Sequence, residues 1–152
     1  MSIILMIDEE ELLSKFPAYI KSRIKQNIFS FPSDIQWVYT PIKAYRSVVR
    51  KSNDSHPICK SDMLSKFEMY GNSPKRARGF RWDESNPLLY GVSLFEDKNA
   101  LKNAMTMRPE NKVAVGMITQ NGGPCERGES THVCWWLYED VDLSSFKIDE
   151  EG

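Results

Sequence analysis

The sequence predicts a single α+β domain, residues 1–152, in which an N-terminal helical segment precedes a mixed or antiparallel sheet with one main helix. Three observations predict this class. Apolar residues near the N-terminus recur every three or four positions, as on one face of a helix. The later apolar runs are short, rich in β-branched and aromatic residues, and separated by turn residues. Finally, 152 residues that are 41% hydrophobic and 11% aromatic suit one domain with its own core.

The first element is a helical lead segment, residues 1–30. Between positions 8 and 29 the apolar residues return at helical spacing, and Pro17 should kink this helix or begin a second one because proline lacks an N–H. The residues expected on the buried face are Ile7, Leu12, Leu13, Phe16, Ile20, Ile24 and Ile28. The run Phe31-Pro32-Ser33-Asp34 should end the helix.

Four extended segments follow, at 35–50, 88–95, 112–119 and 131–138. Pro41 interrupts the first of them. In the last, strand alternation separates two sets of side chains. One face is expected to carry His132, Cys134 and Trp136, and the other Val133, Trp135 and Leu137.

Two shorter helices are predicted at 62–70 and 97–107, and a turn-rich loop at 120–130. Residues 51–86 form a long basic loop region around the first of these helices, and residues 140–152 form an acidic tail. Loops this long in a compact domain tend to be functional or mobile.

Charge is unevenly distributed although the net charge is only −1. Residues 43–81 hold ten basic and three acidic side chains, whereas residues 112–152 hold three basic and eight acidic ones. Such a polarised molecule can steer an anionic ligand towards its basic side. A solvated basic loop facing an acidic tail is the alternative interpretation.

The chain has three cysteines, an odd number that cannot form a complete disulfide framework. The N-terminus has no basic region before its apolar residues, and no segment is long and apolar enough to span a bilayer. We therefore expect a cytoplasmic protein that does not associate with membranes. Zinc-type spacing is poor among His56, Cys59, Cys125, His132 and Cys134, so the cysteines are expected to be unpaired and metal-free.

No nucleophile elbow of the G-x-S-x-G type and no glycine-rich phosphate loop is present. Instead, the middle of the chain carries a series of short motifs. These are Ala44-Tyr45-Arg46-Ser47, Gly79-Phe80-Arg81-Trp82-Asp83, Leu89-Tyr90-Gly91-Val92-Ser93 and Ala100-Leu101. Their order resembles the ADP-ribosyltransferase-like superfamily, and most closely its RES branch of NAD-consuming toxins, over residues 44–104. The resemblance implies a split-sheet fold that binds NAD as a substrate.

The resemblance also implies roles for individual residues. An arginine can hold a pyrophosphate with two parallel N–H donors, aromatic rings suit stacking on nicotinamide or adenine, and a hydroxyl can hold a sugar. The residues expected to bind NAD are Tyr45, Arg46, Arg81, Trp82, Tyr90 and Ser93. A carboxylate would stabilise the oxocarbenium-like transition state. The catalytic candidates are Glu126, Glu129 and His132.

This leads to the expectation of an NAD-consuming ADP-ribosyltransferase-like enzyme, acting as a toxin or defence-related effector on an unknown protein or nucleic-acid target. One alternative is a non-enzymatic immunity, antitoxin or anti-defence protein that binds a cognate protein through its charged surfaces. Another is a nucleic-acid binder working through residues 43–81, although the overall charge is not basic and the region lacks interleaved aromatic residues.

Overall fold

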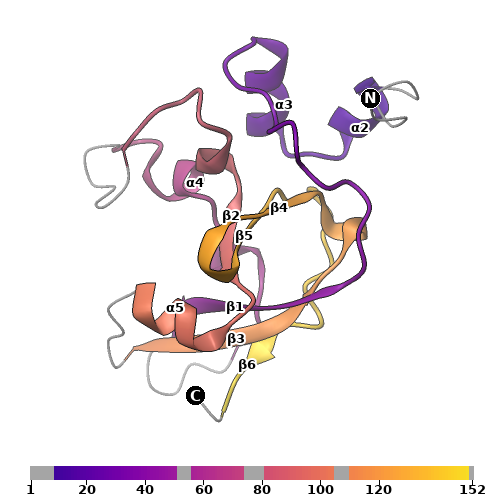
Figure 1. The fold of residues 1–152 in the computed structure, drawn as a ribbon. Coiled ribbons are helices and arrows are strands. Elements are labelled where there is room, and N and C mark those ends of the chain that lie inside the picture. The colour runs from indigo at the N-terminus through magenta and orange to yellow at the C-terminus, as the bar shows by residue number, and fades with distance from the viewer. Residues whose placement is uncertain (1–8, 51–55, 74–80, 105–109, 151–152) are drawn as a thin grey trace.

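The computed structural model describes residues 9–50, 56–73, 81–104 and 110–150. Its centre is a six-stranded antiparallel sheet in the order β4-β5-β2-β1-β3-β6 (Figure 1). The strands are Ile42–Val49 (β1), Val92–Phe95 (β2), Asn111–Ile118 (β3), Cys125–Arg127 (β4), His132–Trp135 (β5) and Lys147–Ile148 (β6). The α+β class predicted from the sequence is therefore confirmed, and the sheet is antiparallel throughout.

The sheet is split between its two central strands. β1 pairs with β3 over eight registered positions, but β1 and β2 share only the pair Tyr45 and Phe95. The first half of the sheet is thus β4-β5-β2 and the second is β1-β3-β6, joined at one point.

Small helices surround the sheet, and proline determines the first boundary. The N-terminal segment forms two helices, Glu9–Ser14 (α2) and Ala18–Lys25 (α3), separated at Pro17. Pro17 has extended backbone angles and precedes the first residue of α3, so the predicted interruption is confirmed. The main helix after β2 is Lys98–Ala104 (α5), and the remainder of the predicted 97–107 helix lies outside the described residues.

The helix expected at 62–70 is shorter in the structure. A 3₁₀ turn, Lys60–Asp62 (η1), precedes the helix Lys66–Tyr70 (α4). The Ser65 side chain accepts a hydrogen bond from the Glu68 backbone N–H at 3.2 Å, and the Glu68 carboxylate accepts one from the Ser65 N–H at 3.0 Å. This capping box fixes where α4 begins.

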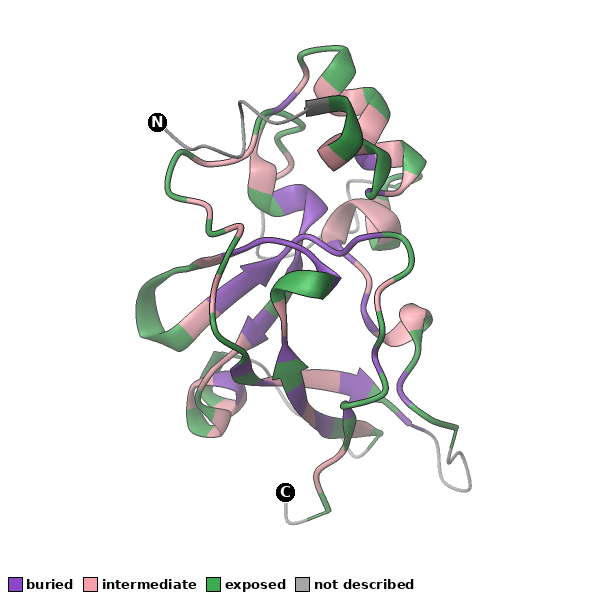
Figure 2. Cartoon of the chain, turned by 90° about the vertical axis from the view of Figure 1, so that its right-hand side faces the viewer, coloured by how far each residue is buried: buried purple, intermediate pink, exposed green. Residues whose placement is uncertain are grey.

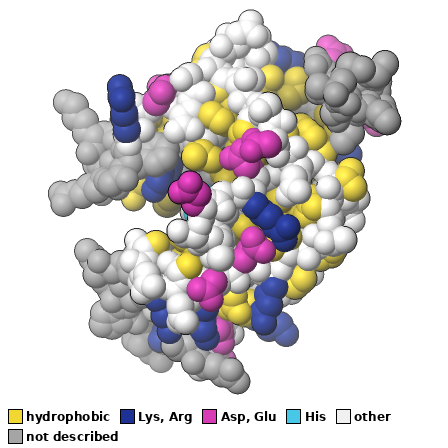
Figure 3. Space-filling model, in the orientation of Figure 1, with side chains coloured by type: hydrophobic (Ala, Val, Ile, Leu, Met, Phe, Trp, Pro, Cys, Tyr) yellow, Lys and Arg dark blue, Asp and Glu magenta, His cyan; other side chains and the backbone are white. Residues whose placement is uncertain are grey.

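Two apolar clusters lie on opposite faces of the sheet, whose strands are largely buried (Figure 2). The molecular surface, by contrast, carries acidic and basic side chains close together on the face shown in Figure 3. One cluster is built on Ala44, Val48, Leu94, Ala114 and Trp135, and the 58–63 segment covers part of it through Ile58 and Met63. The members of the other are Phe16, Ile20, Phe29, Leu89, Tyr90, Cys134, Trp136 and Tyr138. The N-terminal helices therefore cover only one end of that second face.

Several boundaries differ from the sequence-based prediction. β1 begins at Ile42 and not at residue 35, since Pro41 lacks an N–H and the preceding residues form only an isolated bridge between Gln36 and Cys125. β2 begins at Val92 because Pro87–Tyr90 form a 3₁₀ turn (η3) that the Asn86 side chain caps.

Two strands lie where no strand was predicted. β4 lies inside the predicted 120–130 loop, and β6 lies in the acidic tail, where it pairs with β3. β5 ends at Trp135, although extended residues continue to Tyr138. Within the described residues, no helix has the length and apolar character needed to cross a bilayer.

Candidate active site

Strand register gathers several of the sequence-predicted residues on one face of the sheet. Ser93 on β2 lies opposite Cys134 on β5, and Glu126 on β4 lies on the other side of Cys134. Directly opposed residues in an antiparallel pair share a face. Glu126 and Ser93 are therefore two strands apart in one row, about 10 Å between their Cα atoms given the usual strand spacing.

The next row on this face holds His132, Phe95 and Tyr45, which lie opposite one another across β5, β2 and β1. The three side chains are half-buried, unlike the fully buried Trp136, which directly follows β5. We call Tyr45, Ser93, Glu126 and His132 the face site.

A short hydrogen bond joins two members of the face site. Ser93 Oγ lies 2.6 Å from His132 Nε2. The Phe95 ring packs edge-on against the imidazole, with ring centroids 5.2 Å apart. Burial lowers the pKa of His132, so the imidazole is neutral at pH 7. When the neutral ring carries its proton on Nδ1, Nε2 accepts a hydrogen bond from the Ser93 hydroxyl group.

Arg46 bridges β1 to β2 just beyond their single registered pair. Its guanidinium donates to three backbone carbonyls, those of Ser93 at 2.7 Å, Asp62 at 2.8 Å and Leu64 at 3.0 Å. Burial lowers the pKa of Arg46 to about 10, which still leaves it a cation at pH 7. The contact with Ser93 is with its backbone, since alternation along β1 gives Arg46 the sheet face of Ala44 and Val48 and not that of the Ser93 side chain.

Part of the donor capacity of Arg46 remains unused. A guanidinium has five N–H donors, and the three carbonyls use one hydrogen from each nitrogen. Within the described ranges, one N–H on each terminal nitrogen makes no hydrogen bond. Lys66 lies close enough that its pKa is lowered, first by its own burial and second by the Arg46 charge. Two neighbouring cations of this kind favour an anionic ligand.

Glu126 has the most unusual carboxyl group on this face. Burial, together with a hydrogen bond and repulsion from Asp34, raises its pKa to about 7. Asp34 reaches this position because the Gln36–Cys125 bridge brings the chain before β1 alongside β4. A carboxyl group with a pKa near neutrality suits acid–base chemistry at physiological pH.

The remaining predicted residues lie elsewhere. Tyr90 is only 1% exposed, stacks on Phe29 at 4.1 Å and donates to the Glu84 carbonyl, so it is a core residue. Trp82 is half-buried and stacks on Phe67 in the same aromatic cluster. Arg81 is exposed, and Glu129 is exposed in the 3₁₀ turn Glu129–Thr131 (η5).

The cysteines do not supply a nucleophile at this site. All three are free of disulfide bonds, which confirms the expectation that they are unpaired. Burial raises the pKa of Cys125 to about 11 and raises that of Cys134 well above its ordinary value. Both thiols are therefore protonated at neutral pH.

Sequence reasoning missed Asp34, Lys66 and Asp62. Asp34 appeared as part of a helix stop, and the other two appeared as charges in a basic region. Their positions depend on contacts between distant segments, and no spacing rule in the chain signals them. Comparison with models of known protein families, with curated proteins and with solved structures finds no match.

Proposed function

We propose that this protein is an NAD-consuming, ADP-ribosyltransferase-like enzyme. One observation carries the proposal: Ser93, where the sheet splits, accepts a hydrogen bond from Arg46 at its backbone carbonyl and is hydrogen-bonded to His132 through its side chain, which joins three residues far apart in the sequence. Glu126 lies on the same face one row from His132. A phosphate-binding cation, a sugar-binding hydroxyl, a neutral base and a carboxyl group are the parts that cleavage of NAD requires.

Binding of the dinucleotide rests on Arg46. Each of its two terminal nitrogens keeps one N–H without a hydrogen bond within the described residues, and a guanidinium can bind phosphate oxygens through two such donors. Lys66 adds a second positive charge nearby. The half-buried Tyr45 ring offers an aromatic surface on the face site, and the Ser93 hydroxyl can hold a ribose hydroxyl.

The chemistry breaks the bond between the ribose C1′ and the nicotinamide nitrogen. The bonding electron pair leaves with nicotinamide, whose ring loses its positive charge, and C1′ gains oxocarbenium character. The ionised form of Glu126 stabilises this charge electrostatically. Water or a nucleophile of the target then bonds to C1′, and neutral His132 accepts the proton that the nucleophile loses.

The acceptor of the ADP-ribose group is an unknown protein or nucleic acid, and the role of a toxin or defence-related effector follows from such chemistry. The excess of basic side chains over residues 43–81 would favour an anionic partner. Free thiols suit a reducing compartment, and we place the protein in the cytoplasm.

The test is release of nicotinamide from NAD by the purified protein, with NAD binding measured separately by calorimetry. Glu126→Gln should abolish release while leaving NAD binding nearly intact, since the carboxylate is needed only as charge develops. Glu129→Gln is the matched control, because it makes the same change three residues away on an exposed turn. It should leave release unchanged.

Two outcomes would contradict the proposal. Wild-type protein that neither binds nor cleaves NAD, with or without candidate target proteins, would favour the non-enzymatic alternative. Loss of release in Glu129→Gln but not in Glu126→Gln would show that the face site is not the reaction centre.

A further inference from the structure

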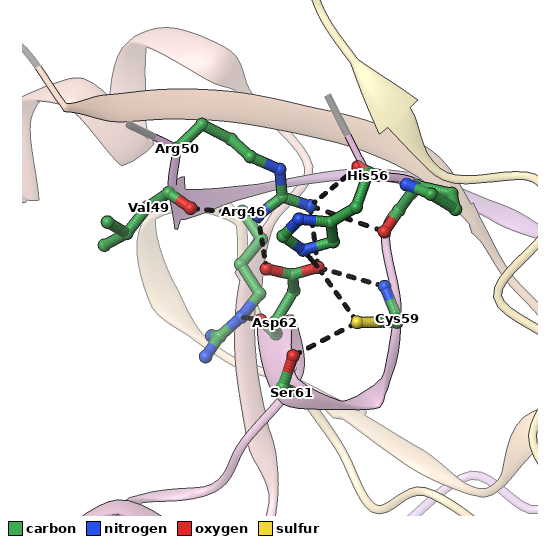
Figure 4. Close-up of polar contacts among 8 residues, drawn as sticks. Arg46, Val49, Arg50, His56, Cys59, Ser61 and Asp62 are labelled. Carbon is green, nitrogen blue, oxygen red and sulfur yellow. Dashed lines mark hydrogen bonds and ion pairs between the residues drawn. The ribbon is translucent and has the colours of Figure 1, made fainter. Parts of the chain in front are cut away.

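Three metal-ligand side chains meet outside the face site, in the segment that follows β1. His56, Cys59 and Asp62 follow one another at intervals of three residues, and their ligand atoms all lie within 4.8 Å of one another (Figure 4). Asp62 Oδ2 is the common neighbour, 3.8 Å from His56 Nε2 and 3.6 Å from Cys59 Sγ. The proposed function uses none of these side chains.

These separations fit a metal ion between the three atoms. Zinc binds sulfur at about 2.3 Å and imidazole nitrogen or carboxylate oxygen at about 2.0–2.2 Å, so tetrahedral angles separate such ligands by about 3.4–3.6 Å. The two separations from Asp62 Oδ2 are close to these values. The third separation, between a ring nitrogen of His56 and Cys59 Sγ, is no more than 4.8 Å.

The carboxylate at the centre is already oriented by outer contacts. Arg50 donates to both oxygens of Asp62, at 2.6 and 2.8 Å, and the Cys59 backbone N–H donates to Oδ2 at 3.0 Å. Ligands of bound metals are commonly held in this way by a second layer of hydrogen bonds. The Asp62 side chain is only 8% exposed, whereas His56 is 44% exposed, so an ion would be bound on one side and open to solvent on the other.

From this arrangement we propose that His56, Cys59 and Asp62 form a zinc site with three protein ligands and one open position. A thiolate, an imidazole and a carboxylate together select zinc over the harder cations magnesium and calcium. Cys59 must lose its thiol proton to the solvent when the metal–sulfur bond forms, so binding releases one proton. The thiolate and the Asp62 carboxylate offset the charge of the ion beside Arg50.

The bound ion would tie the segment after β1 to the sheet, because Asp62 is paired with Arg50 at the end of β1. The proposal departs from the sequence-based expectation that Cys59 is metal-free. That expectation considered Cys125 and Cys134 as partners, whereas the structure places Cys125 in one apolar cluster and Cys134 in the other. Asp62 takes their place.

The experiment is titration of the reduced full-length protein with Co²⁺ and with Zn²⁺. Co²⁺ should bind at one equivalent with a cobalt–thiolate charge-transfer band, Zn²⁺ should displace it, and calorimetry in two buffers should show release of about one proton. Cys59→Ser should remove the band, and His56→Ala should weaken zinc binding by at least about tenfold. Asp62 is not substituted in this experiment, because it is the counter-charge of the buried Arg50 and its loss would also destabilise the fold.

His132→Ala is the matched control, since His132 is the other histidine of the chain and lies on the face site. It should bind Co²⁺ as the wild type does. The proposal fails if the wild type binds no stoichiometric metal, if Cys59→Ser keeps the thiolate band, or if His132→Ala weakens binding as much as His56→Ala. None of these outcomes depends on NAD, so the test of the zinc site is independent of the test of the proposed enzymatic function.

Discussion

Arg46 and Arg50 lie four residues apart, in and directly after β1, but their surroundings differ. Arg50 is 4% exposed and forms a two-oxygen ion pair with Asp62. Arg46 donates only to backbone carbonyls, and within the described residues no carboxylate lies at hydrogen-bonding distance from it. Asp62 pairs directly with Arg50, whereas Arg46 is held by backbone carbonyls, and the more distant charges of Asp62 and Glu68 partly oppose the lowering of its pKa by burial.

The largest expected effect on stability comes from the buried ion pair between Arg50 and Asp62. Asp62→Asn should lower the free energy of unfolding by about 3–5 kcal/mol, because it leaves the buried Arg50 cation without a counter-charge. Chemical denaturation at pH 7 measures this. Glu84→Gln removes the exposed partner of Arg23 and should cost less than about 1 kcal/mol. Equal costs for the two variants would show that the Arg50 pair is not structural.

The same pair predicts a pH dependence. The hydrogen bonds from Arg50 are the main reason that the pKa of Asp62 is lowered below its ordinary value of 3.8. A lowered carboxyl pKa adds stability that is present above the ordinary pKa and is lost as pH falls through the folded one. The stability difference between wild type and Asp62→Asn should therefore shrink below about pH 4.

Substitution of Arg46 should cause a smaller loss of stability, together with a loss of ligand binding. Arg46→Lys cannot reach all three carbonyls and should cost about 1–3 kcal/mol. In addition, ADP-ribose should raise the melting temperature of the wild type but not of Arg46→Lys, which is measured by thermal denaturation with and without the ligand. If the variant is stabilised by ADP-ribose as much as the wild type, Arg46 is only structural, like Arg50.

The Ser93–His132 pair should affect activity far more than stability. His132→Ala should abolish nicotinamide release, and its melting temperature should stay close to that of the wild type because the ring is half-exposed on the face site. Parallel activity and melting measurements test this. A stable and fully active His132→Ala protein would remove His132 from the mechanism. A loss of about 1–3 kcal/mol in stability with full activity would make it a scaffold residue.

At Glu126 the expected effect on stability depends on pH, and its sign follows from the raised pKa. Since the folded pKa is about 7 and the ordinary value is 4.5, the folded state holds the proton more tightly, and stability falls as pH rises between these values. The glutamine of Glu126→Gln does not ionise and does not cause this loss of stability. The melting temperature of the variant should therefore rise relative to that of the wild type between pH 5 and pH 8. Wild-type turnover should rise through pH 7 as the carboxylate forms. A constant difference in melting temperature between the two proteins from pH 5 to pH 8, or wild-type turnover that does not rise through pH 7, would reject this role.

Local features of the chain were sufficient to predict several elements. Pro17 removes a backbone donor wherever it occurs, so the break between α2 and α3 could be predicted without any tertiary contact. The alternation in 112–119 predicted β3, and the odd number of cysteines predicted unpaired thiols. The face shared by His132 and Cys134 follows from alternation alone, and strand register confirms it.

Other features were decided only by the tertiary structure. β4 and β6 are two or three residues long and exist because a neighbouring strand supplies their hydrogen bonds. Tyr90 resembled a ligand-binding aromatic in the sequence, yet the aromatic cluster under the N-terminal helices buries it. The sequence by itself determined the fold class and the residue types available for chemistry. Which arginine meets a carboxylate and which serine meets a histidine depended on strand register and chain crossings, because those contacts join segments dozens of residues apart that no local preference brings together.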